Sequence, residues 1–278
     1  MNIAVAGLGL IGGSFAKAIK SKTDHKVTGF DISEEALNKA LDTGAIDSAE
    51  KTNISGADLI LIALYPTACV EFVRENAVNF KKGAVIVDLC GVKRFVCTEI
   101  NAAIAGQDIV FIGGHPMAGR ELSGFDNSLP ELFENASMIL TPDNNTDEKI
   151  LKSVEAFFLS LGFKRITLTS PEHHDEMIAF TSQLAHIVSS AYVQSPIASE
   201  FMGFSAGSFG DMTRVAKLNE DMWTELFMLN RDFLTQQLDV IISNLSEFRE
   251  YISIGERENL HEMLKNGRII KEIFNSKN

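Results

Sequence analysis

The stretch Gly7-Leu8-Gly9-Leu10-Ile11-Gly12 has the pattern Gly-x-Gly-x-x-Gly and decides how the rest of the chain is interpreted. The apolar run Asn2–Ala6 before it predicts a β-strand, and the pattern after it predicts a helix over Ile11–Lys20. Glycines between a strand and a helix permit a tight turn, close packing and a close approach of the backbone to a pyrophosphate. The N-terminus of the helix attracts phosphate through its unpaired amides. The motif therefore predicts a dinucleotide site with cofactor contacts at Gly7, Leu8, Gly9, Leu10, Ile11 and Gly12.

Short β-branched runs alternate with helical patterns over the first 168 residues, as is typical of a parallel α/β sheet. The predicted strands are Asn2–Ala6, Lys26–Phe30, Asp58–Leu64, Ala84–Leu89, Ile109–Ile112, Ser137–Thr141 and Lys164–Leu168. The predicted helices between them are Ile11–Lys20, Glu34–Thr43, Ala68–Phe80, Lys93–Ala105 and Asp147–Leu161. We therefore expect a Rossmann-type doubly wound parallel sheet over residues 1–168. The irregular segment Met117–Asn135 has the length of a functional loop.

Only helical patterns follow Ser170-Pro171, a pair typical of a helix start. The predicted helices are Met177–Tyr192, Met222–Leu245 and Glu256–Phe274. Met177–Tyr192 is apolar on most sides, so we expect it to be buried. The length and apolarity of these helices predict an all-α domain over residues 169–278 that is shared between the subunits of a homodimer.

Composition restricts the class of protein. The chain has 278 residues, 45% of them hydrophobic, and a net charge of −12, which argues against nucleic acid or an anionic membrane as the main partner. An anionic substrate would then need individually placed cations. The three cysteines have no metal-ligand spacing and fit a reducing, cytoplasmic compartment. We find no signal-peptide pattern and no apolar run near the ~20 residues that span a bilayer.

Three further segments are expected at the cofactor. Asp31 ends the second predicted strand, where a carboxylate binds adenosine ribose hydroxyls and repels a 2′-phosphate, so NAD is favoured over NADP. Ala63 and Leu64 end the third strand, and Gly91 follows the fourth. Because ligands of open parallel sheets bind at the carboxyl edge, we expect these residues to converge there.

His115 is the leading candidate for proton transfer. It lies in Gly113-Gly114-His115-Pro116-Met117-Ala118-Gly119, directly after a predicted strand. Glycines let a ligand approach closely, and Pro116 keeps His115 out of helical geometry. The alternative is a histidine that caps a turn. The preceding dinucleotide motif favours the catalytic interpretation, because a base is then close to a hydride-transfer centre.

The helical region contains two polar clusters. His186 ends Thr181-Ser182-Gln183-Leu184-Ala185-His186 and could equally be a core histidine. Arg214 ends a segment that begins at Gly207, and it could bind a carboxylate or pair with Asp211 on the surface. In a continuous helix His174 and His186 would be ~18 Å apart along the axis and ~120° apart around it, so we predict no shared metal ion.

Taken together, these motifs resemble the prephenate/arogenate dehydrogenase family of tyrosine biosynthesis over nearly the whole chain. The resemblance rests on Gly7–Gly12, the His115 segment, His174-Asp175, Ser182–His186 and Asp211-Met212-Thr213-Arg214 with Trp223. It implies an oxidative decarboxylation in which NAD takes a hydride from the ring carbon that bears the hydroxyl. It further implies a homodimer.

The resemblance also implies residue roles. His115 accepts the hydroxyl proton, for which a neutral imidazole near pH 7 is suited. Arg214 anchors a substrate carboxylate, His186 is a second polar contact, and Trp223 shapes the pocket. Glu121 is similar to a gating residue of the family. The other two predicted substrate residues are Arg120 and Gly207.

Departures and rival functions remain. Gly91 stands where many members have a serine, so a hydroxyl that helps to hold substrate is missing. Arg120 stands where some have a small hydroxyl residue, which adds a cation near the substrate. Arogenate is the alternative substrate. A β-hydroxyacid dehydrogenase would place a catalytic lysine in the helical region, where Lys217 matches no motif. A non-catalytic NAD-binding regulator would not need His115, His186 and Arg214.

Overall fold

The computed structural model describes residues 1–50 and 54–277, and they divide into two compact units, residues 1–230 and residues 231–278. The first unit is built on one eight-stranded sheet with the order β3-β2-β1-β4-β5-β6-β7-β8. The strands are β1 (Asn2–Ala6), β2 (Lys26–Phe30), β3 (Ser48–Ala49), β4 (Leu59–Ile62), β5 (Ala84–Asp88), β6 (Ile109–Pro116), β7 (Ser137–Pro142) and β8 (Arg165–Leu168).

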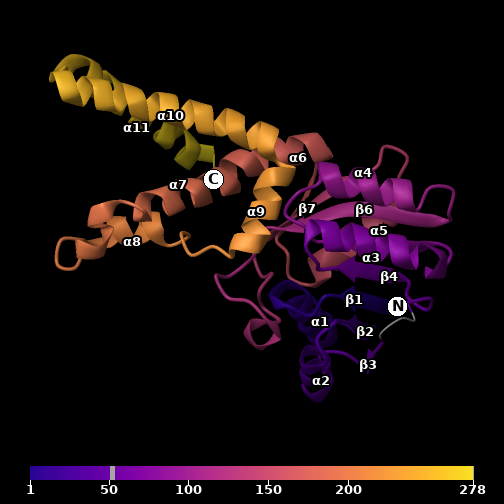
Figure 1. Ribbon diagram of the computed structural model, residues 1–278. Coiled ribbons are helices and arrows are strands. Elements are labelled where there is room, and N and C mark those ends of the chain that lie inside the picture. The colour runs from indigo at the N-terminus through magenta and orange to yellow at the C-terminus, as the bar shows by residue number, and fades with distance from the viewer. Residues whose placement is uncertain (51–53, 278) are drawn as a thin grey trace. The chain divides into compact units, whose positions relative to one another are not determined.

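Every neighbouring pair of strands is parallel except β6 and β7, which are antiparallel. This mostly parallel sheet with flanking helices confirms the Rossmann-type fold predicted from the sequence (Figure 1). The predicted end of the fifth strand at Ile112 is wrong. Strand β6 continues to Pro116 because Gly113, Gly114 and His115 pair with β7, so His115 lies within the sheet.

Helices cover both faces of the sheet, as the alternating pattern predicts (Figure 1). One apolar cluster joins the sheet to α1 (Leu10–Lys22), α2 (Glu34–Asp42) and α5 (Glu148–Ser160). A second cluster, on the other face, includes α3 (Pro66–Asn76), α4 (Arg94–Ala103) and α9 (Glu220–Leu229). Short turns at η1 (Ala77–Asn79) and η2 (Phe125–Asn127) lie between these elements.

A long interrupted helix follows β8. It consists of α6 (Pro171–Ile178), a π-helical segment η3 (Ala179–Gln183) and α7 (Leu184–Val193). Ser170 caps its start by accepting a hydrogen bond from the amide of His173. The prediction of one regular buried helix over 177–192 is wrong, because Met177, Phe180 and Tyr192 are exposed and the α-helical register is broken at η3. The turn η4 (Pro196–Glu200) and the helix α8 (Gly207–Thr213) follow.

The helix predicted over 222–245 is also two helices. Helix α9 ends at Leu229, and α10 (Arg231–Ile254) begins after Asn230, which has the non-helical dihedrals φ −119° and ψ 23°. The side chain of Asn230 is buried, and it donates to the carbonyl oxygen of Asp175 and to the Gln183 side chain. These bonds explain the break, because they hold Asn230 in a tertiary network. The second unit consists of α10 and α11 (Arg257–Lys277).

Candidate active site

The glycine-rich turn after β1 has the shape that a dinucleotide requires. Gly7 has φ +84°, a left-handed conformation that favours glycine, and a Cβ on Gly12 would collide with the carbonyl oxygen of Gly7. A Cβ on Gly9, in contrast, would meet no atom within 4 Å. Gly9 therefore borders open space at the N-terminus of α1, whose first turn carries no acidic side chain. This arrangement fits a bound pyrophosphate.

The end of β2 adds a carboxylate to this turn. One oxygen of Asp31 accepts a hydrogen bond from the amide of Leu8 at 2.6 Å, and the other accepts one from the amide of Ser33 at 2.8 Å. A carboxylate oxygen has two lone pairs, so Asp31 keeps acceptor capacity for ribose hydroxyls. The structure thus joins Asp31 to the glycine turn. Ala63 follows β4 beside that turn, since its carbonyl oxygen is the nearest atom to a Cβ placed on Gly7.

A buried ion pair lies where β5 leads into α4. The side chains of Lys93 and Asp88 are both fully buried and bonded to each other. Lys93 Nζ also donates to the carbonyl oxygen of Gly114 at 2.6 Å, and Asp88 accepts from the amide of Gly114 at 3.1 Å. Both charges therefore hold the backbone of the residue before His115. Burial opposes the Lys93 cation, but the charge of Asp88 outweighs it and raises the pKa of Lys93.

His115 is half-buried and forms one end of a chain of three side chains, of which the other two are buried. Its Nδ1 lies 2.9 Å from Nε2 of His174, whose Nδ1 lies 2.8 Å from Oδ1 of Asp175. Burial lowers the pKa of His115 well below its usual range, and the neighbouring His174 and Lys93 lower it further. His115 is therefore neutral at pH 7 and can accept a proton. We call His115, His174 and Asp175 the buried triad.

Sequence reasoning did not assign a role to His174, Asp175, Lys93 or Asp88. The pair His174-Asp175 contributed to the family resemblance, but nothing in its spacing indicates a contact with a histidine 59 positions away. The one local signal was a pair of polar residues directly after the start of an amphipathic helix. Their burial, at 2% and 0% exposure, is visible only in the fold.

A second group of predicted residues meets at α7, α8 and α9. Arg214 donates to Glu121 at 2.8 Å, and the ring of His186 contacts that of Trp223, with centroids 4.0 Å apart and planes tilted by 44°. His186 Nδ1 lies 3.0 Å from the carbonyl oxygen of Val215, which follows Arg214 in the chain. We call His186, Trp223, Arg214 and Glu121 the exposed cluster.

The geometry of the exposed cluster bears on two of the alternatives that the sequence left open. Among the described residues Arg214 forms its ion pair with Glu121 and not with Asp211 of its own helix. His186 is half-buried, so it is not a fully enclosed core histidine. Burial lowers the pKa of His186 and the Arg214 charge lowers it too, against the hydrogen bond with the Val215 carbonyl.

The remaining predicted residues are Arg120, Gly207, Gly91 and Leu64. Arg120 is exposed in the loop between β6 and β7, and Gly207 is exposed at the start of α8. A Cβ on Gly91 would lie 3.4 Å from Leu226 of α9, close to ordinary packing distance. The position of the missing serine hydroxyl is therefore sterically open. Leu64 accepts a hydrogen bond from the Cys90 thiol at 3.4 Å, which joins the ends of β4 and β5.

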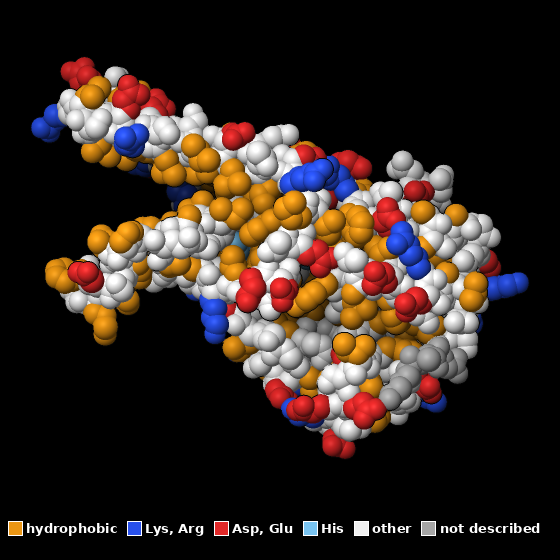
Figure 2. All heavy atoms as spheres, in the orientation of Figure 1, with side chains coloured by type: hydrophobic (Ala, Val, Ile, Leu, Met, Phe, Trp, Pro, Cys, Tyr) orange, Lys and Arg blue, Asp and Glu red, His pale blue; other side chains and the backbone are white. Residues whose placement is uncertain are grey.

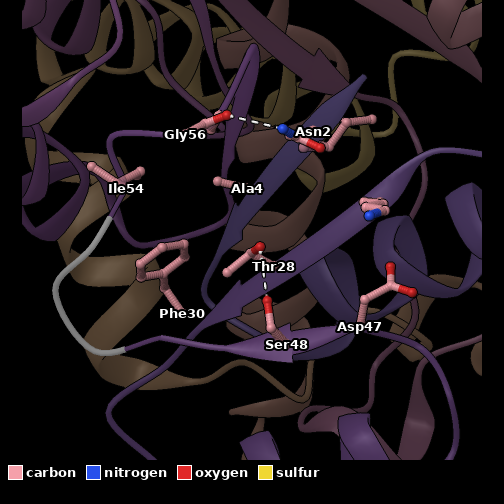
Figure 3. Close-up of a pocket in the computed structure, with 11 residues that line it drawn as sticks. Asn2, Ala4, Thr28, Phe30, Asp47, Ser48, Ile54 and Gly56 are labelled. Atoms are coloured by element: carbon pink, nitrogen blue, oxygen red, sulfur yellow. Dashed lines mark hydrogen bonds between the residues drawn. The ribbon is translucent and has the colours of Figure 1, made fainter.

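A surface hollow elsewhere is formed by different residues. It lies over β1, β2 and β3, where Thr28 bonds Ser48 at 3.0 Å and Asn2 bonds Gly56 at 3.3 Å (Figure 3). None of the described residues that line it belongs to the predicted site. In residues 1–50 and 54–277 no group of three or more His, Cys, Asp or Glu could hold a metal ion. No helix in that part is long and apolar enough to cross a membrane.

Two family descriptions match this chain. Residues 15–167 match "Prephenate dehydrogenase, nucleotide-binding domain", and residues 170–266 match "Prephenate dehydrogenase, dimerization domain". The boundary between the two matches falls next to the start of α6.

Individual proteins are similar over almost the whole length. Prephenate dehydrogenase of Bacillus subtilis is 33% identical over 283 residues, which cover 96% of this chain and 74% of that protein. Cyclohexadienyl dehydrogenase of Zymomonas mobilis is 31% identical, with 95% of this chain and 92% of that protein covered. A crystal structure of prephenate dehydrogenase from A. aeolicus, in complex with hydroxyphenyl propionate and NAD+, has a TM-score of 0.88 and 29% identity. That similarity covers 99% of this chain and 98% of the other.

Proposed function

The chain belongs to the prephenate dehydrogenase family, and from that premise we propose that it oxidises and decarboxylates prephenate with NAD. The products are 4-hydroxyphenylpyruvate, CO2 and NADH, in the biosynthesis of tyrosine. One observation carries the proposal within this structure: a neutral histidine, His115, lies at the carboxyl edge of a nucleotide-binding sheet with Nδ1 engaged by His174. NAD, when bound, supplies the hydride acceptor for the ring carbon that bears the hydroxyl.

His115 handles the proton in this reaction. Its Nε2 accepts the hydroxyl proton as the hydride leaves, so that the hydroxyl becomes a carbonyl. Loss of CO2 from the ring then moves an electron pair to that carbonyl oxygen and makes the ring aromatic. The oxygen takes a proton back and becomes the phenol. Aromatisation drives the loss of CO2, so no separate base is required for it.

The cofactor residues are proposed at the first turn and its neighbours. The turn from Gly7 through Leu8, Gly9, Leu10 and Ile11 to Gly12 holds the pyrophosphate, and Asp31 binds the ribose hydroxyls. Ala63, Leu64 and Gly91 complete the cofactor site along the sheet edge. Because the Asp31 carboxylate repels a 2′-phosphate, NAD is the preferred cofactor rather than NADP.

The substrate carboxylates are proposed to bind the exposed cluster. Arg214 offers the cation, and His186 and Trp223 form one wall, since their rings are in contact. Glu121 accepts a hydrogen bond from Arg214 in this structure. It thereby controls whether the Arg214 guanidinium is free to bind the substrate. Arg120 and Gly207 complete the proposed substrate set from the two exposed segments beside it. Water or Cys90 takes the place of the serine hydroxyl absent at Gly91.

We also propose that the active form is a homodimer, with a cofactor domain over 1–168 and a substrate and dimer domain over 169–278. The match to a dimerization domain supports this assembly. Exposed apolar side chains gather on η3, α7, η4, α8 and the connection between η4 and α8, and Figure 2 shows hydrophobic atoms on this part of the first unit. They are Phe180, Tyr192, Ile197, Phe201, Met202, Phe204 and Met212. Three buried free thiols fit a cytoplasmic location.

NADH formation at 340 nm tests the function with purified protein, NAD and either prephenate or arogenate. We expect a rate with prephenate, and the ratio of the two rates assigns the substrate. Arogenate is the second candidate, because one relative is named for the cyclohexadienyl ring that both compounds share. No rate with either compound, despite NAD binding, would refute the proposal. Sedimentation at several concentrations tests the dimer, and a monomer mass throughout would contradict it.

A further inference from the structure

We propose that His174 and Asp175 are positioning residues that fix the tautomer of His115, with the proton on Nδ1 and the lone pair on Nε2. The inference rests on the proposed function, in which Nε2 of His115 accepts a proton from the substrate. It assigns a task to two buried residues that the proposed reaction does not otherwise use.

Asp175 is the fixed end of the buried triad. Its Oδ1 accepts from the backbone amide of Lys93 at 2.7 Å, and its Oδ2 accepts from the amide of Arg94 at 2.9 Å. These amides lie at the N-terminus of α4, where an anion is stabilised by unpaired N–H groups. Burial opposes ionisation, but the bonds from His174, Arg94 and Lys93 outweigh it and lower the pKa of Asp175. Asp175 is therefore a carboxylate at neutral pH.

The charge of Asp175 determines where His174 carries its proton. An ionised carboxylate only accepts hydrogen bonds, so Nδ1 of His174, 2.8 Å from Oδ1 of Asp175, must be the donor. Burial lowers the pKa of His174 more than the bond with Asp175 raises it. The ring is therefore neutral at pH 7, and its Nε2 holds a lone pair.

The tautomer of His174 in turn determines the tautomer of His115. Its Nδ1 lies 2.9 Å from the unprotonated Nε2 of His174, so Nδ1 of His115 must be the donor. The lone pair of His115 is then on Nε2, the nitrogen that the proposed reaction uses. A free histidine in water favours the opposite tautomer, with the proton on Nε2. The buried triad thus reverses the intrinsic preference of the ring.

One of the surrounding charges, that of Lys93, also keeps the rings neutral, whereas Asp88 and Asp175 raise the pKa of His174. Lys93 and Asp88 are the charged groups that face the two rings from the β5–α4 connection, and Asp175 faces His174 from α6. Lys93 disfavours a second cation on either ring, so both imidazoles stay neutral. Its bond to the carbonyl oxygen of Gly114 also fixes the backbone next to His115. Position and tautomer of His115 are therefore set by one connected group.

A purely structural role is the competing explanation. In that case the bonds of Asp175 would only attach α6 to the N-terminus of α4, and Asn230 would strengthen the attachment through the Asp175 carbonyl. Removing the His174 ring would then change stability without changing the protonation pattern of His115. The two explanations therefore predict different tautomers of His115, and different kcat values, for a His174 variant that is fully folded.

Nitrogen-15 NMR of histidine-labelled enzyme, with NAD bound, reads the tautomer without requiring turnover. We expect the spectrum of His115 to show a protonated Nδ1 and an unprotonated Nε2 at pH 7.5, with His115→Asn identifying the signals. In His174→Leu we expect the two nitrogens to move toward the averaged values of a mixed tautomer. A wild-type His115 with its proton on Nε2, or a mixture, would overturn the inference.

Kinetics give the second measurement. We expect His174→Leu to lower kcat by about 100-fold, near the low end of what a positioned base contributes, while KM changes less than about threefold. His174→Gln retains a hydrogen-bond acceptor for His115, so its kcat should be at least about tenfold higher than that of His174→Leu. His173→Leu is the matched control, because its exposed side chain pairs only with Glu176 among the described contacts.

The two proposals fail in different ways. Wild-type enzyme that is inactive with both substrates refutes the proposed function, while the NMR spectrum still tests the tautomer. Active wild-type enzyme whose His174→Leu variant is folded and equally fast refutes the positioning role. If His174→Leu does not fold, the spectrum of the wild type and the kinetics of His174→Gln decide the question.

Discussion

The buried triad and the exposed cluster hold the two halves of the proposed chemistry in opposite environments. The side chains of His174 and Asp175 are 0% exposed, whereas those of Arg214 and Glu121 are 67% and 43% exposed. Hydrogen bonds in a buried network face no competition from water, so they can hold one tautomer. An exposed ion pair contributes only ~0–1 kcal/mol, so a substrate carboxylate can displace one partner at little cost. Burial therefore suits the proton chemistry, and exposure suits the exchange of ligands.

Both groups depend on the same interrupted helix. Helix α6 carries His174, and α7 carries His186 beyond the π segment η3. A π turn takes up more residues than an α turn, so side chains beyond it are rotated backwards around the axis. Gln183 lies in that segment, and its side chain bonds Leu226 and Asn230 of the buried network. The helix thus continues from a buried environment to an exposed one without a loop.

The largest effect is expected at His115, the end of the buried triad that accepts the substrate proton. His115→Asn removes the proton acceptor and should lower kcat by about 10²- to 10⁴-fold while NAD binding is unchanged. Stopped-flow turnover and NAD titration by fluorescence measure the two quantities. His261→Asn, an exposed substitution in α11, is the control. Near-normal turnover of His115→Asn would show that the buried triad is not the proton acceptor.

The exposed cluster should respond through substrate affinity. Arg214→Gln removes a charge-assisted hydrogen bond worth about 1.5–3 kcal/mol, so KM for prephenate should rise about 10- to 100-fold with kcat little changed. Arg214→Lys keeps the charge but loses the bidentate geometry, and its KM should be intermediate. Initial-rate kinetics measure both variants. If Arg214→Gln instead lowered kcat at constant KM, the exposed cluster would not be a site that acts through substrate affinity alone.

The pH dependence of activity tests the environment of His115 in the buried triad without a mutation. His115 must be neutral to accept a proton, and burial lowers its pKa well below the ordinary 6.5. Activity should therefore persist as pH falls below 6.5 and decline about tenfold per pH unit only below the lowered pKa. Measuring kcat/KM from pH 4.5 to 8 in a constant-ionic-strength buffer tests this. An acid limb at or above pH 6.5 would contradict the environment assigned to His115.

The smallest effect is expected at Glu121, the proposed gating residue of the exposed cluster. Glu121→Gln breaks an exposed ion pair and should change the free energy of unfolding by no more than ~1 kcal/mol. Because Arg214 is then free for substrate, KM should fall about two- to fivefold. Added salt should reduce the difference between wild type and variant, since it screens exposed charges. A rise in KM would instead indicate that Glu121 contacts the substrate directly.

Local patterns were sufficient for most of the nucleotide-binding sheet. The strands and helices around Gly7–Gly12 were predicted within a few residues, because each carries its own apolar periodicity and turn residues. The end of β6 and the breaks at η3 and Asn230 were not predicted. Each of them involves a distant partner: β7 pairs with His115, Gln183 of η3 donates to the Leu226 carbonyl oxygen, and Asn230 donates to the Asp175 carbonyl oxygen. Periodicity within one segment contains no information about such partners.

The sequence by itself determined the class of fold, the glycine turn that fits a pyrophosphate, and the single histidine on which the proposed chemistry rests. Those features depend on residues that are neighbours in the chain, where backbone conformation is a local property. Only the tertiary structure decided that His174 lies beside His115 and that Arg214 faces Glu121. Tautomer, pKa and ion pairing depend on contacts and on exclusion of water, and both arise only when the helices pack on the sheet.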